Sequence, residues 1–350
     1  MYEAHKEIFS QGKELAMTFD EVIKRSGEIK SAFEDFDYEE IVFLACGSSY
    51  WASLSAYMTM QRLTGKKCFA VKSGDVVMDS EYYTGSYKKP LLILPSRSGK
   101  TSETIIAAEI LRDRYQSKII GLVEYGDAQI KDIADFTLEL PWANETGLFQ
   151  TRSFSNLYLA SIMLAAIVSD NEPLIQDIQK YLGAFDQLSK EAEEKIRNII
   201  EGFSGWNYLA ALGSGIVYGV AVEGAYINIE MSRFPSGYYG TLEWRHGPII
   251  MADAGTLVSI TSSAKAREYE ENIAKDTKAK QARVLSVSAL NDFENSDYKF
   301  FLGWPCADEI VALYSVMVMQ GLAYYKTLER NLDPDDPGGL VRWISIEAEK

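Results

Sequence analysis

One stretch of the chain carries the side chains best suited to holding a small anion. It reads Leu91-Leu-Ile-Leu-Pro-Ser-Arg-Ser-Gly-Lys-Thr-Ser-Glu-Thr104. The apolar run predicts a buried strand, and a helical pattern begins at Thr101. A helix N-terminus offers backbone N–H groups and a partial positive charge, which suit a phosphate. The hydroxyls of Ser96, Ser98, Thr101 and Ser102 add donors, so we predict an anion site at this turn.

Two other interpretations of this turn are a nucleotide-binding P-loop and a plain helix cap. Gly99-Lys100-Thr101 matches the end of a P-loop, but that motif requires a glycine at position 94, which is Leu94. A nucleotide site is therefore not predicted. A cap needs only one hydroxyl that accepts from the first helical turn. Four hydroxyls within seven residues exceed that need and favour the anion site.

Two carboxylates further along the chain are candidates for acid–base chemistry. Glu223 and Glu230 lie seven residues apart in a predicted helix, so both face the same side of it. Charged pairs on helices commonly mark a solvated face. The neighbouring residues here are apolar, which predicts a half-buried carboxylate with a raised pKa. Such a group can act as a base toward a carbon-bound proton.

A histidine is the third candidate. His246 lies in the turn Gly240–Pro248, beside Glu243 and Arg245. A lone histidine is more commonly structural than catalytic, and that interpretation stays open. Imidazole titrates near neutral pH without help, which suits a proton shuttle to an oxygen atom.

Strands alternate with helices along the chain, which predicts parallel sheets covered on both faces. Ligands in such sheets bind at the carboxyl ends of the strands. The predicted strands are residues 41–46, 68–71, 91–94, 118–123, 136–140, 208–213, 256–262 and 283–288, with main helices at about 47–63, 101–115, 155–168 and 308–328. The short polar motifs Gly47-Ser48, Ser96–Ser98, Gly213-Ser214 and Thr261-Ser262 all follow predicted strands.

The second half of the chain repeats landmarks of the first. Gly47 and Gly213 lie 166 positions apart, as do Ser96 and Ser262. A shared offset indicates an internal duplication and predicts two α/β halves. Gly213-Ser-Gly215 also suggests a dinucleotide fingerprint, but the third glycine position holds Tyr218, so this match is weak.

Composition excludes several classes of partner. The chain has 350 residues, a net charge of −15 and a pI near 4.8. An acidic surface repels nucleic acid and anionic membranes, so neither is expected as a partner. Three scattered cysteines and two histidines predict no disulfide framework and no metal site. The chain shows no signal peptide and no transmembrane run, so a cytoplasmic location is expected.

Taken together, these motifs resemble the sugar isomerase (SIS) family in its double-SIS form. The similarity is to the isomerase domain of glucosamine-6-phosphate synthase and to stand-alone phosphosugar isomerases and deglycases, over about residues 40–347. The matching motifs are Cys46-Gly-Ser-Ser-Tyr50, Ser96-Arg-Ser-Gly-Lys-Thr101, Glu145-Thr-Gly-Leu-Phe-Gln-Thr-Arg-Ser-Phe154, Glu223-Gly-Ala, Glu230 and Glu243-Trp-Arg-His-Gly-Pro248.

The resemblance implies an α/β fold of two SIS subdomains, each a flavodoxin-like parallel sheet between two helical layers. The implied domains are an N-terminal helical segment at 1–38, a first SIS domain at 39–170, a helical connector at 171–202, a second SIS domain at 203–330 and a C-terminal tail over the active site at 331–350.

The resemblance also implies roles for individual residues. Glu230 matches the family base that moves a proton between C1 and C2. His246 matches the ring-opening histidine, which a neighbouring subunit often donates, so a homodimer is implied. Glu223 and Arg342 complete the implied catalytic set. No metal or organic cofactor is expected. The implied phosphosugar-binding residues are Gly47, Ser48, Ser49, Ser96, Arg97, Ser98, Thr101, Glu145 and Gln150.

Three positions depart from the family pattern. Ile227 and Arg342 stand where the synthases have lysines, and neither residue forms an imine. Gln150 stands where the family has a serine. The chain begins directly with SIS-like sequence, so glutamine-dependent synthesis is not expected. The remaining activities are isomerisation, deamination or deglycation of a hexose or amino-sugar 6-phosphate. The alternative is a non-catalytic regulatory protein that senses a phosphosugar.

Overall fold

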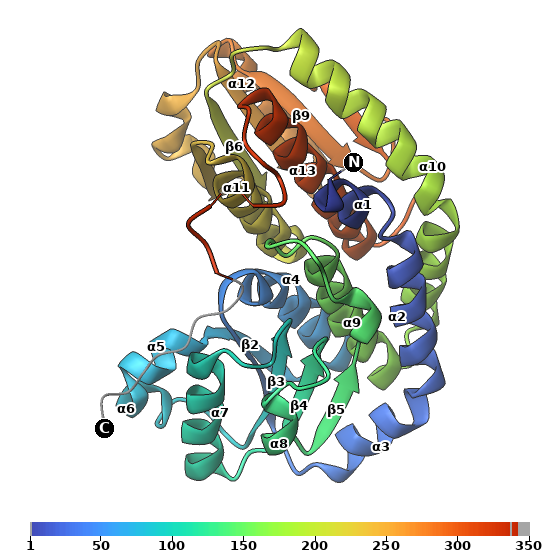
Figure 1. The fold of residues 1–350 in the computed structure, drawn as a ribbon, viewed down its shortest axis with the longest axis vertical. Coiled ribbons are helices and arrows are strands. Elements are labelled where there is room, and N and C mark those ends of the chain that lie inside the picture. The colour runs from blue at the N-terminus through green and yellow to red at the C-terminus, as the bar shows by residue number, and fades with distance from the viewer. Residues whose placement is uncertain (1, 337, 342–350) are drawn as a thin grey trace. The chain divides into compact units, whose positions relative to one another are not determined.

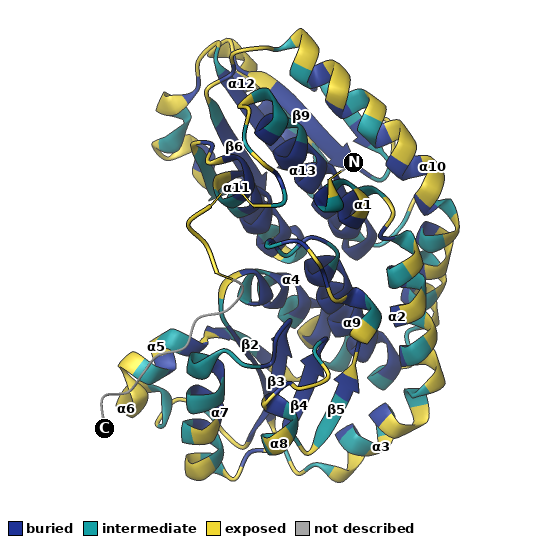
Figure 2. Ribbon diagram, viewed as in Figure 1, coloured by how far each residue is buried: buried dark blue, intermediate teal, exposed yellow. Residues whose placement is uncertain are grey.

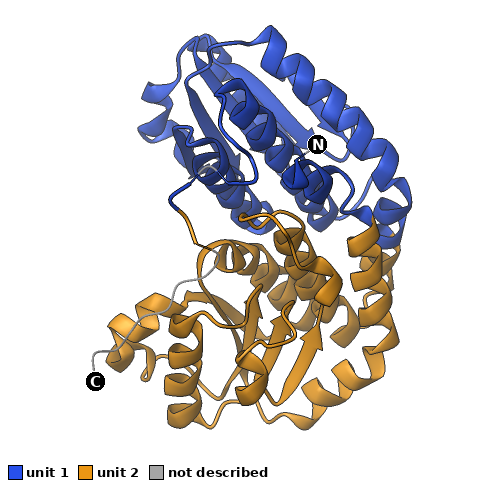
Figure 3. Cartoon of the chain, in the orientation of Figure 1, with its two compact units in different colours: residues 1–12, 177–339 blue, residues 13–176, 340–350 orange. Residues whose placement is uncertain are grey.

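The computed structural model describes residues 2–336 and 338–341. The chain divides into two compact units, which Figure 3 distinguishes by colour. Unit 1 comprises residues 1–12 and 177–339, and unit 2 comprises residues 13–176 and 340–350. The helices α2 (Gly12–Lys24) and α10 (Glu172–Gly202) each begin in one unit and end in the other.

Unit 2 is built on a parallel sheet that has, within the described residues, five strands in the order β2-β1-β3-β4-β5. This is the flavodoxin-like order. The central strands are buried along their whole length, as parallel strands covered on both faces require. The strands are β1 (Glu40–Ala45), β2 (Lys67–Lys72), β3 (Pro90–Ser96), β4 (Ile119–Val123) and β5 (Phe136–Glu139).

Helices cover both faces of this sheet (Figure 1). Helices α4 and α9 pack together on one face, and α5 and α7 pack on the other. Helix α9 is buried at nearly every position, which explains its apolar sequence (Figure 2). The helices are α3 (Ser26–Asp35), α4 (Gly47–Thr64), α5 (Ser73–Met78), α6 (Ser80–Tyr83), α7 (Ser102–Tyr115), α8 (Ile130–Ile133) and α9 (Arg152–Val168), with a 3-10 turn η1 (Pro141–Ala143).

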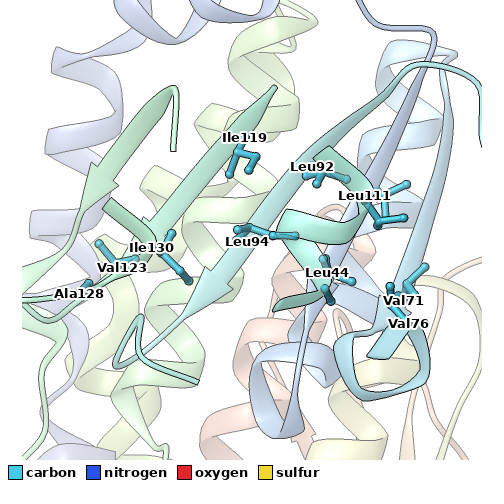
Figure 4. Packing of buried hydrophobic residues seen from close by; sticks show 13 residues of the cluster. Leu44, Val71, Val76, Leu92, Leu94, Leu111, Ile119, Val123, Ala128 and Ile130 are labelled. Carbon is cyan, nitrogen blue, oxygen red and sulfur yellow. The ribbon is translucent and has the colours of Figure 1, made fainter. Parts of the chain in front are cut away.

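The core between the sheet and α7 is aliphatic (Figure 4). Leu44 of β1 and Leu92 and Leu94 of β3 belong to one buried cluster with Val76 of α5 and Leu111 of α7. Because side chains alternate along a strand, the residues between them turn to the face covered by α4 and α9. Apolar packing on both faces therefore holds the carboxyl ends of β1 and β3 in place.

Unit 1 repeats this architecture with strand order β10-β9-β8-β6-β7, again parallel throughout the described residues. Helices α11 and α13 pack together on one face, and α12 contributes to the core on the other. The elements are α1 (Glu3–Phe9), β6 (Tyr208–Gly213), η2 (Gly215–Val217), α11 (Tyr218–Ser232), β7 (Ser236–Gly240), η3 (Glu243–Arg245), η4 (Pro248–Met251), β8 (Thr256–Thr261), α12 (Arg267–Ala279), β9 (Arg283–Ser288), β10 (Tyr298–Phe301) and α13 (Asp308–Glu329).

Read in reverse, the second order β7-β6-β8-β9-β10 has the same topology as β2-β1-β3-β4-β5. The predicted fold class, a pair of α/β units with parallel sheets, is confirmed. The sequence pattern of alternating strands and helices did not predict β7 and β10. Strand β7 has the sequence Ser-Gly-Tyr-Tyr-Gly, whose two glycines disfavour a strand in isolation.

Strand register corrects the predicted offset of the duplication. Pairing between β1 and β3 aligns Glu40 with Pro90, and pairing between β6 and β8 aligns Tyr208 with Thr256. If the two sheets are superposed on β3 and β8, Gly47 matches Gly215 and not Gly213. Both Gly47 and Gly215 have a positive φ, 54° and 61°, where each chain turns from strand to helix. The predicted match of Gly47 with Gly213 was therefore wrong by two residues.

Candidate functional site

A small pocket lies at the carboxyl ends of β1 and β3 in unit 2. Its volume is ≈ 30 Å³, which suits a small group such as the head of a ligand. Six predicted site residues meet here, namely Ser49, Ser96, Arg97, Ser98, Thr101 and Gln150, and the remaining lining residues are Cys46, Pro95 and Thr104. Gly47 and Ser48 belong to the adjoining first turn of α4.

Two helices begin at this pocket. Helix α4 has 18 residues and follows β1, and α7 has 14 residues and follows the neighbouring strand β3. Within the described chain, neither N-cap residue, Cys46 or Thr101, caps its helix with a side-chain hydrogen bond. The partial positive charges of both helix N-termini therefore act on the same small volume, which suits an anion.

The serine hydroxyls are oriented by the backbone of the turn. The Gly99 N–H donates to Ser96 Oγ at 3.0 Å, and the Lys100 N–H donates to Ser98 Oγ at 3.1 Å. A hydroxyl oxygen that accepts in this way keeps its own proton for donation. Ser96 and Ser98 can therefore both donate to an anion in the pocket.

The turn requires glycine at position 99. Gly99 has a φ of 62°, which disfavours residues with a Cβ. A Cβ at this position would also lie 2.3 Å from Ala128 Cβ and 3.3 Å from Val123 Cγ1. Both neighbours belong to the core cluster in Figure 4, so they cannot move aside cheaply. The shape of the anion turn is thus tied to the packing of the sheet.

Arg97 and Glu145 are buried and connect two loops. Arg97 Nη1 lies 3.4 Å from Glu145 Oε2 and donates to the carbonyl oxygens of Leu148 and Phe149, each at 3.1 Å. Glu145 Oε1 accepts from the N–H and Oγ1 of Thr151, both at 2.6 Å. Both side chains are at most 5% exposed. This network holds the loop that carries Gln150 against the anion turn.

A second buried carboxyl group adjoins this network. Ser153 Oγ donates to Glu124 Oε2 at 2.7 Å. Burial raises the pKa of Glu124 from the ordinary 4.5 to about 8, and the negative charge of Glu145 adds to the effect. Glu124 is therefore protonated at neutral pH. The sequence analysis did not find this residue, since a glutamate that follows a strand carries no sign of burial.

The raised pKa makes stability depend on pH. Between pH values of about 4.5 and 8, the folded chain retains a proton on Glu124 that the unfolded chain has lost. Stability therefore falls as pH rises through this window, by about 1.4 kcal/mol per pH unit for one group. Glu124→Gln, which keeps a neutral acceptor for Ser153, should flatten the decline in urea unfolding measured from pH 5 to pH 8.

Glu270 provides a control because burial also raises its pKa, to about 7. Glu270→Gln should remove the loss of stability that Glu270 causes between pH values of about 4.5 and 7. The loss of stability that Glu124 causes should remain. An unchanged pH slope in Glu124→Gln would mean that Glu124 is already ionised in the folded chain.

Other charged and thiol groups near the pocket are turned away or neutral. Lys100 Nζ pairs with Asp127 Oδ2 at 2.5 Å, and Lys100 does not line the cavity. Burial raises the pKa of the Cys46 thiol, so it stays protonated and does not repel an anion. Hydroxyls and helix ends thus line this pocket together with Arg97, whose guanidinium pairs with Glu145.

The candidate acid–base carboxylates lie on α11 in unit 1. Glu223 is buried, with 1% of its surface exposed, and Glu230 is partly buried. Glu230 acts electrostatically on the phenol of Tyr226, whose ring lies 5.6 Å from the ring of Tyr238. Burial raises the pKa of Tyr226, and Tyr238 and the charge of Glu230 raise it further. Glu230 is therefore the more accessible of the two carboxylates.

His246 is exposed on the loop between β7 and β8. Its backbone N–H donates to the Glu243 carbonyl at 2.9 Å, which closes the 3-10 turn η3, and Arg245 pairs with Asp276. Three apolar side chains on the same loop are exposed: Leu242 at 46%, Ile250 at 78% and Met251 at 56%. We call Leu242, Ile250 and Met251 the loop patch.

The matching strand end in unit 1 is occupied by carboxylates of the chain itself. Glu270 accepts from Ser262 Oγ and from the Ser263 N–H, and Asp308 accepts from Ser263 Oγ at 2.6 Å. Thr261 exchanges a hydrogen bond with Ser315. The predicted motif Thr261-Ser262 does follow a strand, but its hydroxyls already have partners within the chain, Ser315 for Thr261 and Glu270 for Ser262.

Arg342, one of the predicted catalytic residues, lies outside the described residues. Among the residues that are described, no group of three or more His, Cys, Asp or Glu side chains is arranged to hold a metal ion. No helix in the described ranges is long and apolar enough to span a membrane.

The fold and pocket together define an α/β protein that can hold a small anion between two helix N-termini at the edge of a parallel sheet. Residues 36–169 match the SIS domain family. This match agrees with the predicted resemblance, and the parallel sheets of the two units agree with the predicted fold of two SIS subdomains.

Curated proteins align with this chain over nearly its whole length. Glutamine–fructose-6-phosphate aminotransferase [isomerizing] of Methanosarcina mazei is 29% identical over 96% of this chain and 53% of the relative. The Vibrio cholerae protein of that name is 27% identical over 98% of this chain and 58% of the relative. The chain thus spans about half the length of these curated relatives.

Solved structures resemble the chain over nearly its full length. Glucosamine-6-phosphate deaminase of Thermotoga maritima has a TM-score of 0.84 and 25% identity, covering 98% of this chain and 99% of that one. Tagatose-6-phosphate ketose/aldose isomerase of Escherichia coli has a TM-score of 0.83 at 20% identity, covering 99% and 97%, and its likeness supports the fold alone.

Proposed function

We propose that the chain is an enzyme that binds a hexose 6-phosphate or amino-sugar 6-phosphate and transfers a proton between C1 and C2. The pocket at the N-termini of α4 and α7 carries this proposal, because it combines two helix dipoles with hydroxyl donors and suits a phosphate. The relatives above are named as enzymes for sugar phosphates of this kind, which favours catalysis over a non-catalytic phosphosugar sensor.

The proposed chemistry assigns one role to each group. The pocket holds the phosphate. His246 assists ring opening, in which the C1–O5 bond breaks, O5 gains a proton and the C1 hydroxyl loses one. Glu230 removes the proton from C2 while O1 gains a proton, which forms the enediol; the carbon-bound proton is then returned to C1 as O2 loses its proton, which yields the ketose. Glu223, buried on the same helix, is the second proposed catalytic carboxylate. If an amine is present on the sugar, water releases it, which gives a deaminase or a deglycase.

The contacts favour supporting roles for two residues that the resemblance assigns to binding. Arg97 and Glu145 bond to each other and to the backbone of the loop 145–151. We therefore propose that they position the pocket, whereas Ser49, Ser96, Ser98 and Thr101 contact the phosphate.

A panel of hexose 6-phosphates and their amino derivatives tests the function. Turnover should appear with at least one member, and ammonia or amine release would separate deaminase and deglycase from isomerase. The double variant Ser98→Ala/Thr101→Ala should weaken phosphosugar binding by about 10²–10⁴-fold, since hydrogen bonds to charged groups contribute about 1.5–3 kcal/mol each. Ser86→Ala, an exposed serine at the other end of β3, is the control. Unchanged affinity in the double variant would move the site elsewhere.

We also propose a homodimer in which the loop patch is covered by a second copy and His246 completes the partner's site. Exposed apolar side chains beside a candidate catalytic residue support this arrangement. Ile250→Lys should yield monomers in analytical ultracentrifugation and lower activity.

Mixed and refolded Glu230→Gln and His246→Ala chains should regain about a quarter of wild-type activity, because half the dimers carry one intact site. No recovery would place both residues in one subunit.

The remaining predictions are part of the same proposal. The SIS subdomains are residues 39–170 and 203–330, joined by the connector 171–202 and flanked by segments 1–38 and 331–350. A cytoplasmic location is supported by Cys46, Cys68 and Cys306, all of which are free thiols.

A further inference from the structure

Gln150 brings an unusual group to the anion pocket. Gln150 lines the cavity together with five residues that carry hydroxyl groups, namely Ser49, Ser96, Ser98, Thr101 and Thr104. Its Oε1 atom is buried and has no hydrogen-bond partner among the described residues. A buried acceptor without a partner is costly, so native structures keep such atoms mainly where a ligand or water satisfies them.

The position of Gln150 is held from both sides. The carbonyl of Phe149 accepts from Arg97, and the N–H of Thr151 donates to Glu145. The backbone on either side of Gln150 is therefore anchored to the buried Arg97–Glu145 pair. A side chain fixed in this way can select a ligand by geometry, since little freedom is lost when the ligand binds.

The phosphate itself does not supply the donor that Oε1 needs. A phosphate monoester at neutral pH is mostly a dianion whose oxygens only accept hydrogen bonds. When the pocket hydroxyls donate to the phosphate, the donor that is left for Oε1 comes from the carbon chain next to the phosphate. In a hexose 6-phosphate the nearest oxygen beyond the ester is O5. In the closed ring O5 is an ether and can only accept, whereas in the open chain it is a hydroxyl and can donate.

We infer that Gln150 recognises the open-chain form of the sugar phosphate by accepting a hydrogen bond from the C5 hydroxyl. This inference rests on the proposed function and adds a residue that determines specificity. Gln150 disfavours the closed ring, whose O5 would face Oε1 acceptor to acceptor. The residue acts on the equilibrium between ring and chain and does not itself take up or release a proton.

Two stable ligands separate the two forms. D-Glucitol 6-phosphate is an open chain with a C5 hydroxyl, and 1,5-anhydro-D-glucitol 6-phosphate fixes O5 in a ring. Dissociation constants for both, and for inorganic phosphate, are measured by calorimetry for the wild type, Gln150→Met and Gln150→Glu. Thermal unfolding verifies that each variant is folded.

The preference for the open chain should fall by about threefold to tenfold in Gln150→Met, which has a similar length and no acceptor of comparable strength. Gln150→Glu keeps the acceptor, so it should keep the preference while weakening all three phosphate ligands by charge repulsion. A wild-type preference for the anhydro ligand, or a preference that Gln150→Met leaves unchanged, would overturn this inference and leave the proposed function standing. If neither sugar phosphate binds the wild type more tightly than inorganic phosphate, the proposed function fails as well.

Discussion

Glu230→Gln should stop the exchange of the C2 proton with solvent while phosphosugar binding persists. The substitution keeps the size and polarity of the side chain and removes the basic oxygen. A positioned general base contributes about 10²–10⁴-fold, so turnover should fall by that factor. Proton exchange is measured in D₂O by NMR on the substrate that the panel identifies. The dissociation constant, measured separately, should change little.

Glu243→Gln is the matched control for this experiment. Glu243 is an exposed carboxylate in the turn η3, and it belongs to the same unit and to the same motif as His246. Its substitution removes one negative charge without touching α11. Exchange at the wild-type rate in Glu230→Gln would remove Glu230 as the base. Equal losses in both variants would point to a general effect of charge.

Glu145→Ala should produce a large loss of stability in unit 2. The substitution removes the carboxylate whose Oε2 lies 3.4 Å from Arg97 Nη1, so the buried guanidinium loses that negative charge. Breaking a buried ion pair in this way costs about 3–5 kcal/mol. Thr151 and Ser153 lose their acceptor at the start of α9 as well. Urea unfolding should show a lower midpoint.

Two further variants test whether the loss comes from the unpaired charge. Asp37→Ala breaks the exposed Lys89–Asp37 pair, and it should have a far smaller effect because water already screens both charges. Arg97→Met combined with Glu145→Ala should recover part of the loss, since an apolar replacement of a buried pair is often nearly neutral. A double variant less stable than Glu145→Ala alone would mean that Arg97 stabilises the fold through its carbonyl contacts.

Local sequence predicted the elements around the anion turn within a residue or two. The run at 91–94 is the centre of β3, and the helix expected at Thr101 begins at Ser102. Strand β7 escaped prediction because two glycines carry no strand propensity, and pairing with β6 stabilises it. The duplication was recognised by Gly-Ser motifs, but its register depends on which glycine must adopt a positive φ, and this is a property of the backbone.

The sequence alone determined the alternation of strands and helices, the hydroxyl-rich turn and the resemblance to the SIS family, because each depends on residues adjacent in the chain. The resemblance implied that Gln150 shares a site with Ser49 and Ser98, and only the tertiary structure showed which segments bring them to one pocket, namely the ends of β1 and β3 and the loop before α9. It likewise decided that Glu124 is buried and protonated, and that carboxylates fill the duplicated turn at Ser262. These properties depend on burial and on contacts between segments far apart in the chain, and neither can be read from a residue and its sequence neighbours.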